Sequence, residues 1–200
     1  MYKFKILVEG YAHPGENGKY HASPTTSLVY DDNVTILVDP GTNSKLLTEA
    51  LDKEGIKCED IKHIFLSHYH PDHFLNLKLF PYAVLYDGSM IWDGDEEIQY
   101  TGTLPNTEIE VVATPGHTME QASLFFNTQE FGLVGLCQDV FWWEDGKQDN
   151  SSFEVLMENI DPFMADLEAL KASRRLVLDR ADWIVPGHGK MFKNPTKDIK

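Results

Sequence analysis

The sequence predicts a mixed α/β fold in which helices cover the outer faces of a pair of β-sheets. Short apolar, β-branched runs recur along the chain, and two longer segments have helical spacing. Their order is strands, helix, strands, helix, strand. Two hundred residues, 42% of them hydrophobic, are enough for a sizeable core, so we expect a single domain over residues 1–200.

The first part of the chain is expected to form strands at residues 4–8, 25–30, 34–38 and 61–66. The Asp-Asn cluster at residues 31–33 predicts a hairpin turn. Residues 10–24 are rich in Gly, Pro, His and Asn and are predicted to form a long loop. Residues 44–54 have helical spacing, with Leu47 and Leu51 on one face and Gly55 after the helix.

The second part predicts strands at residues 83–86, 98–100, 109–113, 123–127, 131–136 and 183–185. The longest helix is predicted at residues 159–178, because apolar side chains recur there at helical spacing: Ile160, Phe163, Leu167, Leu170 and Val177. Arg174 and Arg175 are expected on the solvated face of this helix. Cys137 is expected to be a small buried side chain.

Composition limits the partners and the compartment. A formal net charge of −15 repels a phosphate backbone, so nucleic acid is not an expected partner and a small-molecule substrate is. Cys58 and Cys137 form no C-x-x-C pair, which favours a reducing compartment. The apolar run at residues 6–8 is too short for a signal peptide, and no stretch has the length of a membrane span. We therefore expect a cytoplasmic protein. The oligomeric state is left undetermined by the sequence, and a homodimer is one of the options.

The stretch from residue 68 to residue 73 is the most informative part of the chain, because it holds three imidazoles and one carboxylate: His68, His70, Asp72 and His73. It directly follows the apolar run at residues 64–66. Imidazole and carboxylate groups suit zinc, iron or manganese. Four such groups exceed what one tetrahedral ion needs from a single turn, so the spacing predicts two metal ions. A metal pair in turn indicates a hydrolase.

Three later residues also follow apolar, strand-like runs: His117, Asp139 and His188. A Pro-Gly turn precedes each of the two histidines, which places the imidazole on a sharp bend at a strand end. If these strands and the strand before His68 share one direction, all four side chains reach a single edge of the fold.

These motifs resemble those of the metallo-β-lactamase fold superfamily. The resemblance covers roughly residues 25–190 and rests on H-x-H-x-D-H at 68–73, T-P-G-H-T at 114–118, Asp139, P-G-H-G at 186–189, and Asp-Pro-Gly at 39–41. Residues 76–81 and 114–118 look most similar to the metallo-β-lactamase domain-containing protein 1 group. The resemblance implies a four-layer αββα sandwich.

The resemblance also implies a ligand set. His68, His70 and His117 would hold one metal ion, Asp72, His73 and His188 a second, and Asp139 would bridge them. The implied cofactors are two divalent ions, with zinc favoured over iron or manganese. A shared hydroxide of lowered pKa would attack an acyl carbonyl, and Asp72 would carry a proton to the leaving group. Asp39 would either orient a ligand or serve only in a turn.

The chain departs from the family pattern at two places. Gln138 precedes Asp139 where the family usually has Gly, and residues 118–122 lack the Pro-Gly pair common after the third histidine. The roles of four nearby residues stay open. His13 and His21 are either exposed loop residues or substrate contacts, and Trp142 and Trp143 are either core residues or a substrate platform. His63 is expected to be structural.

The function expected from these residues is hydrolysis of a small ester, thioester or lactone. Asp139 argues against a true β-lactamase, since those enzymes generally carry Cys at the equivalent position. The alternative is a persulfide dioxygenase with one iron held by His68, His117 and Asp139. A metal-dependent nuclease is disfavoured by the negative charge and by the lack of a basic patch. A non-catalytic metal-binding module is disfavoured by the complete ligand set.

Overall fold

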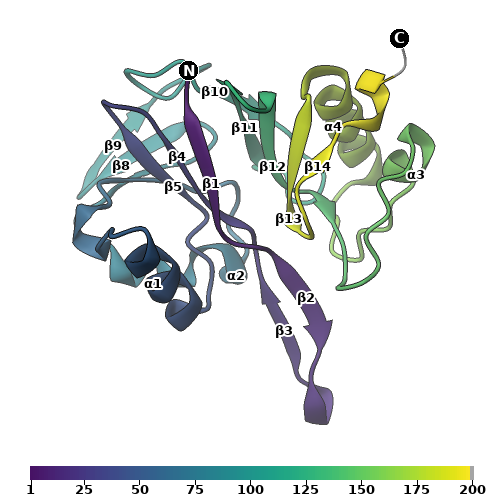
Figure 1. Ribbon diagram of the computed structural model, residues 1–200, viewed down its shortest axis with the longest axis horizontal. Helices are drawn as coiled ribbons and strands as arrows, with labels where there is room; N and C mark the ends of the chain where they lie inside the picture. The colour runs from purple at the N-terminus through teal and green to yellow at the C-terminus, as the bar shows by residue number, and fades with distance from the viewer. Residues whose placement is uncertain (199–200) are drawn as a thin grey trace.

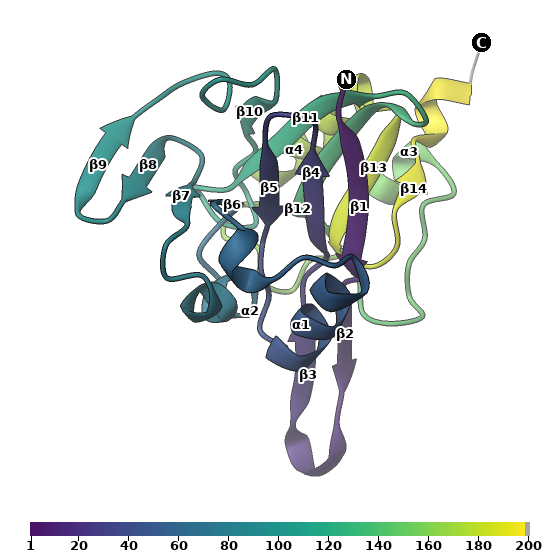
Figure 2. The same ribbon diagram turned by 60° about the vertical axis from the view of Figure 1, so that its left-hand side comes forward.

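The computed structural model, which describes residues 1–198, has two β-sheets packed face to face with helices on both outer sides (Figures 1 and 2). The first sheet has seven strands in the order β1-β4-β5-β6-β7-β8-β9. Their bounds are Lys3–Val8, Thr26–Tyr30, Thr35–Val38, His63–Phe65, Val84–Tyr86, Met90–Asp93 and Glu96–Gln99. Strands β5, β6 and β7 are parallel to one another, and the other neighbours are antiparallel.

The second sheet has five strands in sequence order: β10 (Glu110–Ala113), β11 (Ala122–Thr128), β12 (Gly132–Trp142), β13 (Trp183–His188) and β14 (Phe192–Lys193). Strand β11 is antiparallel to both β10 and β12, and β12 is parallel to β13. Strands β10, β12 and β13 therefore run in one direction. The shared direction considered in the sequence analysis therefore holds for the three strands of this sheet, whereas the strand before His68, β6, belongs to the other sheet.

Helices complete the outer layers. Helix α1 (Ser44–Lys53) covers the first sheet, where Leu47 and Leu51 pack in one apolar cluster with residues of β4, β5 and β6. Helices α3 (Phe153–Met157) and α4 (Leu167–Arg180) cover the second sheet, and Leu170 and Val177 pack against its outer face. The short α2 (Pro71–Phe74) lies between the sheets at their lower edge in Figure 1. Four 3₁₀ turns are described, at Glu16–Gly18, Cys58–Asp60, Leu75–Leu79 and Pro195–Asp198.

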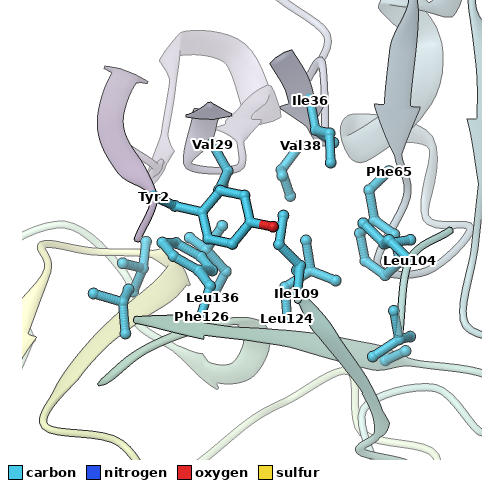
Figure 3. Packing of buried hydrophobic residues seen from close by; sticks show 14 residues of the cluster. Tyr2, Val29, Ile36, Val38, Phe65, Leu104, Ile109, Leu124, Phe126 and Leu136 are labelled. Carbon is cyan, nitrogen blue, oxygen red and sulfur yellow. The ribbon is translucent and has the colours of Figure 1, made fainter. Parts of the chain in front are cut away.

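The main core fills the space between the two sheets (Figure 3). Val29 and Phe65 come from the first sheet, Phe126 and Leu136 come from the second, and the ring of Tyr2 packs between them. The predicted four-layer αββα sandwich is therefore confirmed. The chain also meets the prediction for its cysteines, since Cys58 and Cys137 are free and Cys137 is buried. No helix within residues 1–198 is both long and apolar enough to cross a membrane.

The prediction of a loop at residues 10–24 was wrong. This segment forms an antiparallel hairpin of β2 (Tyr11–Pro14) and β3 (Tyr20–Ser23), which projects away from the sandwich in both views (Figures 1 and 2). Asn17 and Gly18 adopt positive φ at its tip, which allows the chain to reverse there. The Gly and Asn residues thus mark a hairpin turn, and the flanking residues pair as strands.

The predicted start of the long helix was also wrong, because α4 begins at Leu167. The side chain of Asp166 accepts a hydrogen bond from the Ala169 backbone N–H and caps the helix at this point. Upstream, Pro162 disfavours helical geometry at the residue that precedes it. Ile160 and Phe163 lie before the helix and are exposed, whereas Leu170 and Val177 are buried as predicted.

Arg174 was predicted on a solvated face, but it is fully buried beneath α4. Its guanidinium donates to the backbone carbonyls of Val140, Met157 and Asn159, at 3.1, 3.2 and 2.7 Å. Burial lowers the pKa of Arg174 to about 10, against the opposing effect of the carboxylates of Asp161 and Glu158. Arg174 therefore joins α4 to β12 and to the segment after α3. Arg175 is exposed, as predicted.

Arg174→Ala should lower the free energy of unfolding by about 3 kcal/mol or more, because two buried carbonyl groups and one part-buried carbonyl group lose their donors. The matched control is Arg175→Ala, which removes only a surface contact with the Phe153 ring and should cost about 1 kcal/mol or less. Urea denaturation of both variants measures the difference. Equal losses in the two variants would contradict this role for Arg174.

Candidate metal centre

One half of the centre lies on the turn after β6 of the first sheet and on helix α2. His68 and His70 lie in the turn after β6, and His70 is the N-cap residue of α2. Pro71 occupies the first turn of α2, where its missing N–H costs nothing. Asp72 and His73 follow within the helix. The Pro in the motif thus starts a helix that carries two more of the predicted ligands.

A local irregularity in strand β12 sets the direction of the Asp139 side chain. The pairing of β12 with β13 shifts register between Leu136 and Gln138, and Gln138 has a φ of 46°. This left-handed conformation favours Gly, which accounts for the Gly that the family usually has at this position. A bulge of this kind redirects the next side chain. Strand β12 therefore continues past the predicted end at Leu136, and Asp139 lies within it rather than after it.

Two Pro-Gly pairs precede His117 and His188. Pro115-Gly116 lies in the bend after β10, whereas Pro186-Gly187 lies within β13, which ends at His188, and not in the turn expected from the sequence. A Cβ atom on Gly187 would lie 1.7 Å from Asp139 Oδ1, so this position has no room for a side chain. A Cβ on Gly116 would lie 2.2 Å from the Leu170 backbone nitrogen, and Gly116 has a φ of 136°. Each glycine allows a close approach that brings its neighbouring histidine to the centre.

The first group of candidate ligands comprises His68, His70, His117 and Asp139, with one ligand atom from each lying within 4.8 Å of the others. His117 Nε2 lies 2.9 Å from His70 Nδ1 and 3.1 Å from Asp139 Oδ2. His68 Nε2 lies 3.9 Å from the same oxygen. These are the three histidines that the resemblance assigns to the first ion.

The second group comprises Asp72, His73 and His188. Asp72 Oδ2 lies 3.3 Å from His188 Nε2 and 3.9 Å from His73 Nε2. Asp139 Oδ2 also reaches this group, at 3.5 Å from His73 Nε2 and 3.7 Å from His188 Nε2. The structure therefore brings all seven predicted residues together and places Asp139 between the two groups.

Hydrogen bonds hold four of the five imidazoles through their second nitrogen. His68 Nδ1 lies 2.9 Å from Ser67 Oγ, and His188 Nδ1 lies 2.9 Å from the Tyr11 carbonyl oxygen. His73 Nδ1 and Asp39 Oδ2 are 2.7 Å apart. Such contacts orient an imidazole and leave its other nitrogen free for a metal. Of the two roles considered for Asp39, the orienting one therefore matches the structure.

Asp161 holds the fourth imidazole, and the sequence did not reveal it. Its Oδ2 lies 2.6 Å from His117 Nδ1, and the carboxyl group is buried. The apolar spacing of residues 159–178 hid this residue inside a predicted helix. The signal available was the Asp161-Pro162 pair, which disfavours helix at the Asp.

The electrostatics of the cluster are strongly coupled. Burial opposes ionisation of Asp139, but the neighbouring His73 and His188 outweigh it and hold the pKa of this carboxyl well below its usual range. Burial likewise opposes protonation of His73, yet Asp139 and Asp39 raise its pKa well above the ordinary value. Burial, reinforced by His73, lowers the pKa of His68 well below the ordinary value. The ionised buried carboxylates are therefore stabilised by positive charge in this cluster.

Three atoms of the cluster are buried without a hydrogen-bond partner in the described part of the chain: His68 Nε2, His73 Nε2 and Asp139 Oδ1. Buried polar atoms without partners are costly and uncommon. A set of imidazole nitrogens and carboxylate oxygens is also the donor set that zinc or iron accepts. The residues therefore fit a metal centre.

A cavity of about 430 Å³ opens onto this cluster and is lined by His70, Asp72, His117, Asp139 and His188 together with Trp142. Trp142 pairs with His188 across β12 and β13, whereas Trp143 packs in the core beside Phe141. His13 and His21 do not line this cavity, and their rings stack on the hairpin with centroids 5.1 Å apart. His63 packs against Tyr86, away from the cluster. A larger cavity of about 790 Å³, between Tyr11 and Trp143, contains none of the seven residues.

Comparisons with known proteins identify relatives of this chain. The family model described as the metallo-beta-lactamase superfamily matches residues 22–86. The chain is 31% identical over 198 residues to metallo-beta-lactamase domain-containing protein 1 of Xenopus laevis, covering 94% of this chain and 80% of that protein.

Two solved structures share the fold and differ in their metals. The chemotaxis sensor ODP, solved as a peroxy diiron species, has a TM-score of 0.67 and 17% identity, covering 98% of this chain and 88% of that chain. AidC, a dizinc quorum-quenching lactonase, has a TM-score of 0.60 and 18% identity, covering 84% and 74%. The chain is therefore a member of the metallo-beta-lactamase superfamily and a metallo-hydrolase.

Proposed function

We propose that this protein hydrolyses a small ester, thioester or lactone with the help of two divalent metal ions, of which zinc fits best. One observation carries the proposal. Asp139 Oδ2 lies 3.1, 3.5, 3.7 and 3.9 Å from the Nε2 atoms of His117, His73, His188 and His68. A single buried oxygen thus faces histidines of both groups, as a carboxylate shared by two ions would.

The two groups would divide the ligands as the family resemblance implies. The first ion would take His68, His70 and His117, the second Asp72, His73 and His188, and Asp139 would reach both. Imidazole nitrogen and carboxylate oxygen favour zinc, and iron and manganese accept the same set. Bound ions would supply a water molecule of lowered pKa and an electrophile for the carbonyl oxygen.

Asp72 is the residue we assign to proton transfer. Its side chain is 28% exposed and lines the cavity, whereas that of Asp139 is 3% exposed. Burial raises the pKa of Asp72, but the hydrogen bond with His188 and the charge of His73 outweigh it, so the net shift is downward. An ionised carboxylate at the cavity wall can accept a proton from the attacking water and pass it to the leaving group.

The cavity and the charge agree with a small-molecule substrate. Ligand pockets for small molecules are roughly 300–1,000 Å³, and this cavity is about 430 Å³. The formal charge of −15 disfavours a polyanion such as RNA. These observations support hydrolysis of a compact acyl compound over the nuclease alternative.

The metal content of protein purified from its native source tests the proposal most directly. We expect two zinc ions per chain and turnover of at least one member of an ester, thioester and lactone panel. Removing the metal with a chelator should abolish turnover, and added zinc should restore it. A single bound iron, with oxygen uptake in the presence of glutathione persulfide, would instead establish the dioxygenase.

Asp161→Asn should weaken zinc binding about 10- to 100-fold, because the amide holds the His117 imidazole less firmly in its metal-binding orientation. Calorimetric titration of metal-free protein with zinc measures the change. Asp149→Asn, an exposed change of the same chemistry, is the control and should bind zinc like the wild type. Unaltered affinity in Asp161→Asn would show that Asp161 does not orient His117.

Gly187→Ala should reduce the zinc bound per chain, because its Cβ would displace the Asp139 carboxylate from between the two groups. Gly55→Ala is the control for a glycine substitution away from the centre: a Cβ there meets no atom within 4 Å, and the φ of 70° confines its cost to backbone strain. Elemental analysis of both purified variants gives the zinc content. Full occupancy in Gly187→Ala would mean that Asp139 is not needed at its present position.

A further inference from the structure

We propose that the cavity beside the metal centre takes an uncharged substrate and seats its apolar acyl chain between Leu75 and Phe163. This inference rests on the proposed hydrolysis and names the substrate class: neutral esters, thioesters or lactones with an alkyl or aryl acyl group. It depends on three separate observations about the cavity wall.

The first observation is that large apolar side chains surround the mouth of the cavity. Tyr20, Leu75 and Phe163 line it and are 48%, 48% and 55% exposed. Trp142 lies behind them, with its ring 5.4 Å from that of Phe163 and 5.8 Å from that of His188. Two ring contacts through Trp142 therefore connect a candidate ligand, His188, to the exposed Phe163. Exposed apolar groups gathered at a site mark a binding surface.

The second observation is the lack of positive charge. Among the described residues that line this cavity, none is Lys or Arg, whereas Asp72 and Asp139 are both present. A carboxylate or phosphate on the distal part of a substrate would lose its hydration and find no cation to pair with. The wall therefore favours a chain that ends in an apolar group.

The third observation is that the apolar wall is fixed to the metal centre. One oxygen of Asp161 accepts from the Phe163 backbone N–H at 2.9 Å, while the other holds His117 Nδ1 at 2.6 Å. The Ala165 backbone N–H also donates to the Gly116 carbonyl at 2.8 Å. Phe163 is thus positioned against the same turn that carries His117. A preorganised wall of this kind adds specificity at little entropic cost.

A series of esters with one alcohol and acyl chains of two to ten carbons tests the inference. The value of kcat/KM should rise roughly threefold for each added methylene until the wall is covered, because each buried CH₂ is favourable. Chains of equal length that end in a carboxylate should react at least about tenfold more slowly. Equal rates for the neutral and charged series would overturn the inference.

Phe163→Ala should flatten the dependence on chain length and raise KM for the long chains. Tyr82→Ala is the matched control, because this aromatic side chain is 83% exposed and does not line the cavity. Leu75→Lys should reverse the preference and favour the chains that end in a carboxylate, since it places a cation on the wall. Identical chain-length profiles for Phe163→Ala and Tyr82→Ala would contradict the assignment.

Binding without turnover separates this inference from the proposed hydrolysis. Decanamide, a neutral amide with an apolar chain, should bind the protein as purified in a calorimetric titration, and at least about fivefold more weakly to Phe163→Ala than to Tyr82→Ala. Binding in this pattern without hydrolysis of any ester would overturn the proposed function and leave the apolar site standing. Ester hydrolysis without decanamide binding would support the proposed function and overturn the apolar site.

Discussion

A buried carboxylate that faces four imidazoles is the interaction on which this structure depends. Asp139 is almost without exposure, and its Oδ2 lies within 4 Å of histidines from both ligand groups. An ionised group in that position is stable only with compensating positive charge. The neighbouring backbone accommodates Asp139. Gln138 adopts a left-handed conformation, and Gly187 lacks the Cβ atom that would overlap the carboxyl group.

The centre also depends on how the two sheets pack. The segment from His68 to His73 follows a strand of the first sheet, whereas His117, Asp139 and His188 belong to the second. The apolar core between the sheets, with Phe65 on one side and Leu136 on the other, therefore sets the distance between the two halves of the site (Figure 3). Close-packed interiors transmit small shifts, so core substitutions far from the metals can alter the site.

The sequence predicted the parts of the structure that depend on local pattern. Apolar runs located most strands. Short motifs rich in His, Pro and Gly located six residues of the cluster, and Asp139 was located by the apolar run that precedes it. The roles of residues whose contacts lie far away in the sequence were not predicted. Arg174 looks like a surface residue until the carbonyl of Val140 in β12 and those of Met157 and Asn159 are placed beneath it. Asp161 has a role only because His117, 44 residues away in the sequence, packs against it. The hairpin at residues 11–23 was missed because its polar composition resembles that of a loop.

The ways in which the imidazoles are held have different consequences for evolution. His188 is oriented by a main-chain oxygen, that of Tyr11, which any amino acid at that position supplies. The hairpin that begins there can therefore change its side chains, and with them one wall of the cavity, while His188 keeps its orientation. His117 is oriented by the side chain of Asp161, whose other oxygen sets the backbone of Phe163. Descendants of this protein should thus acquire new substrates through substitutions in the hairpin sooner than through remodelling of the segment around Asp161.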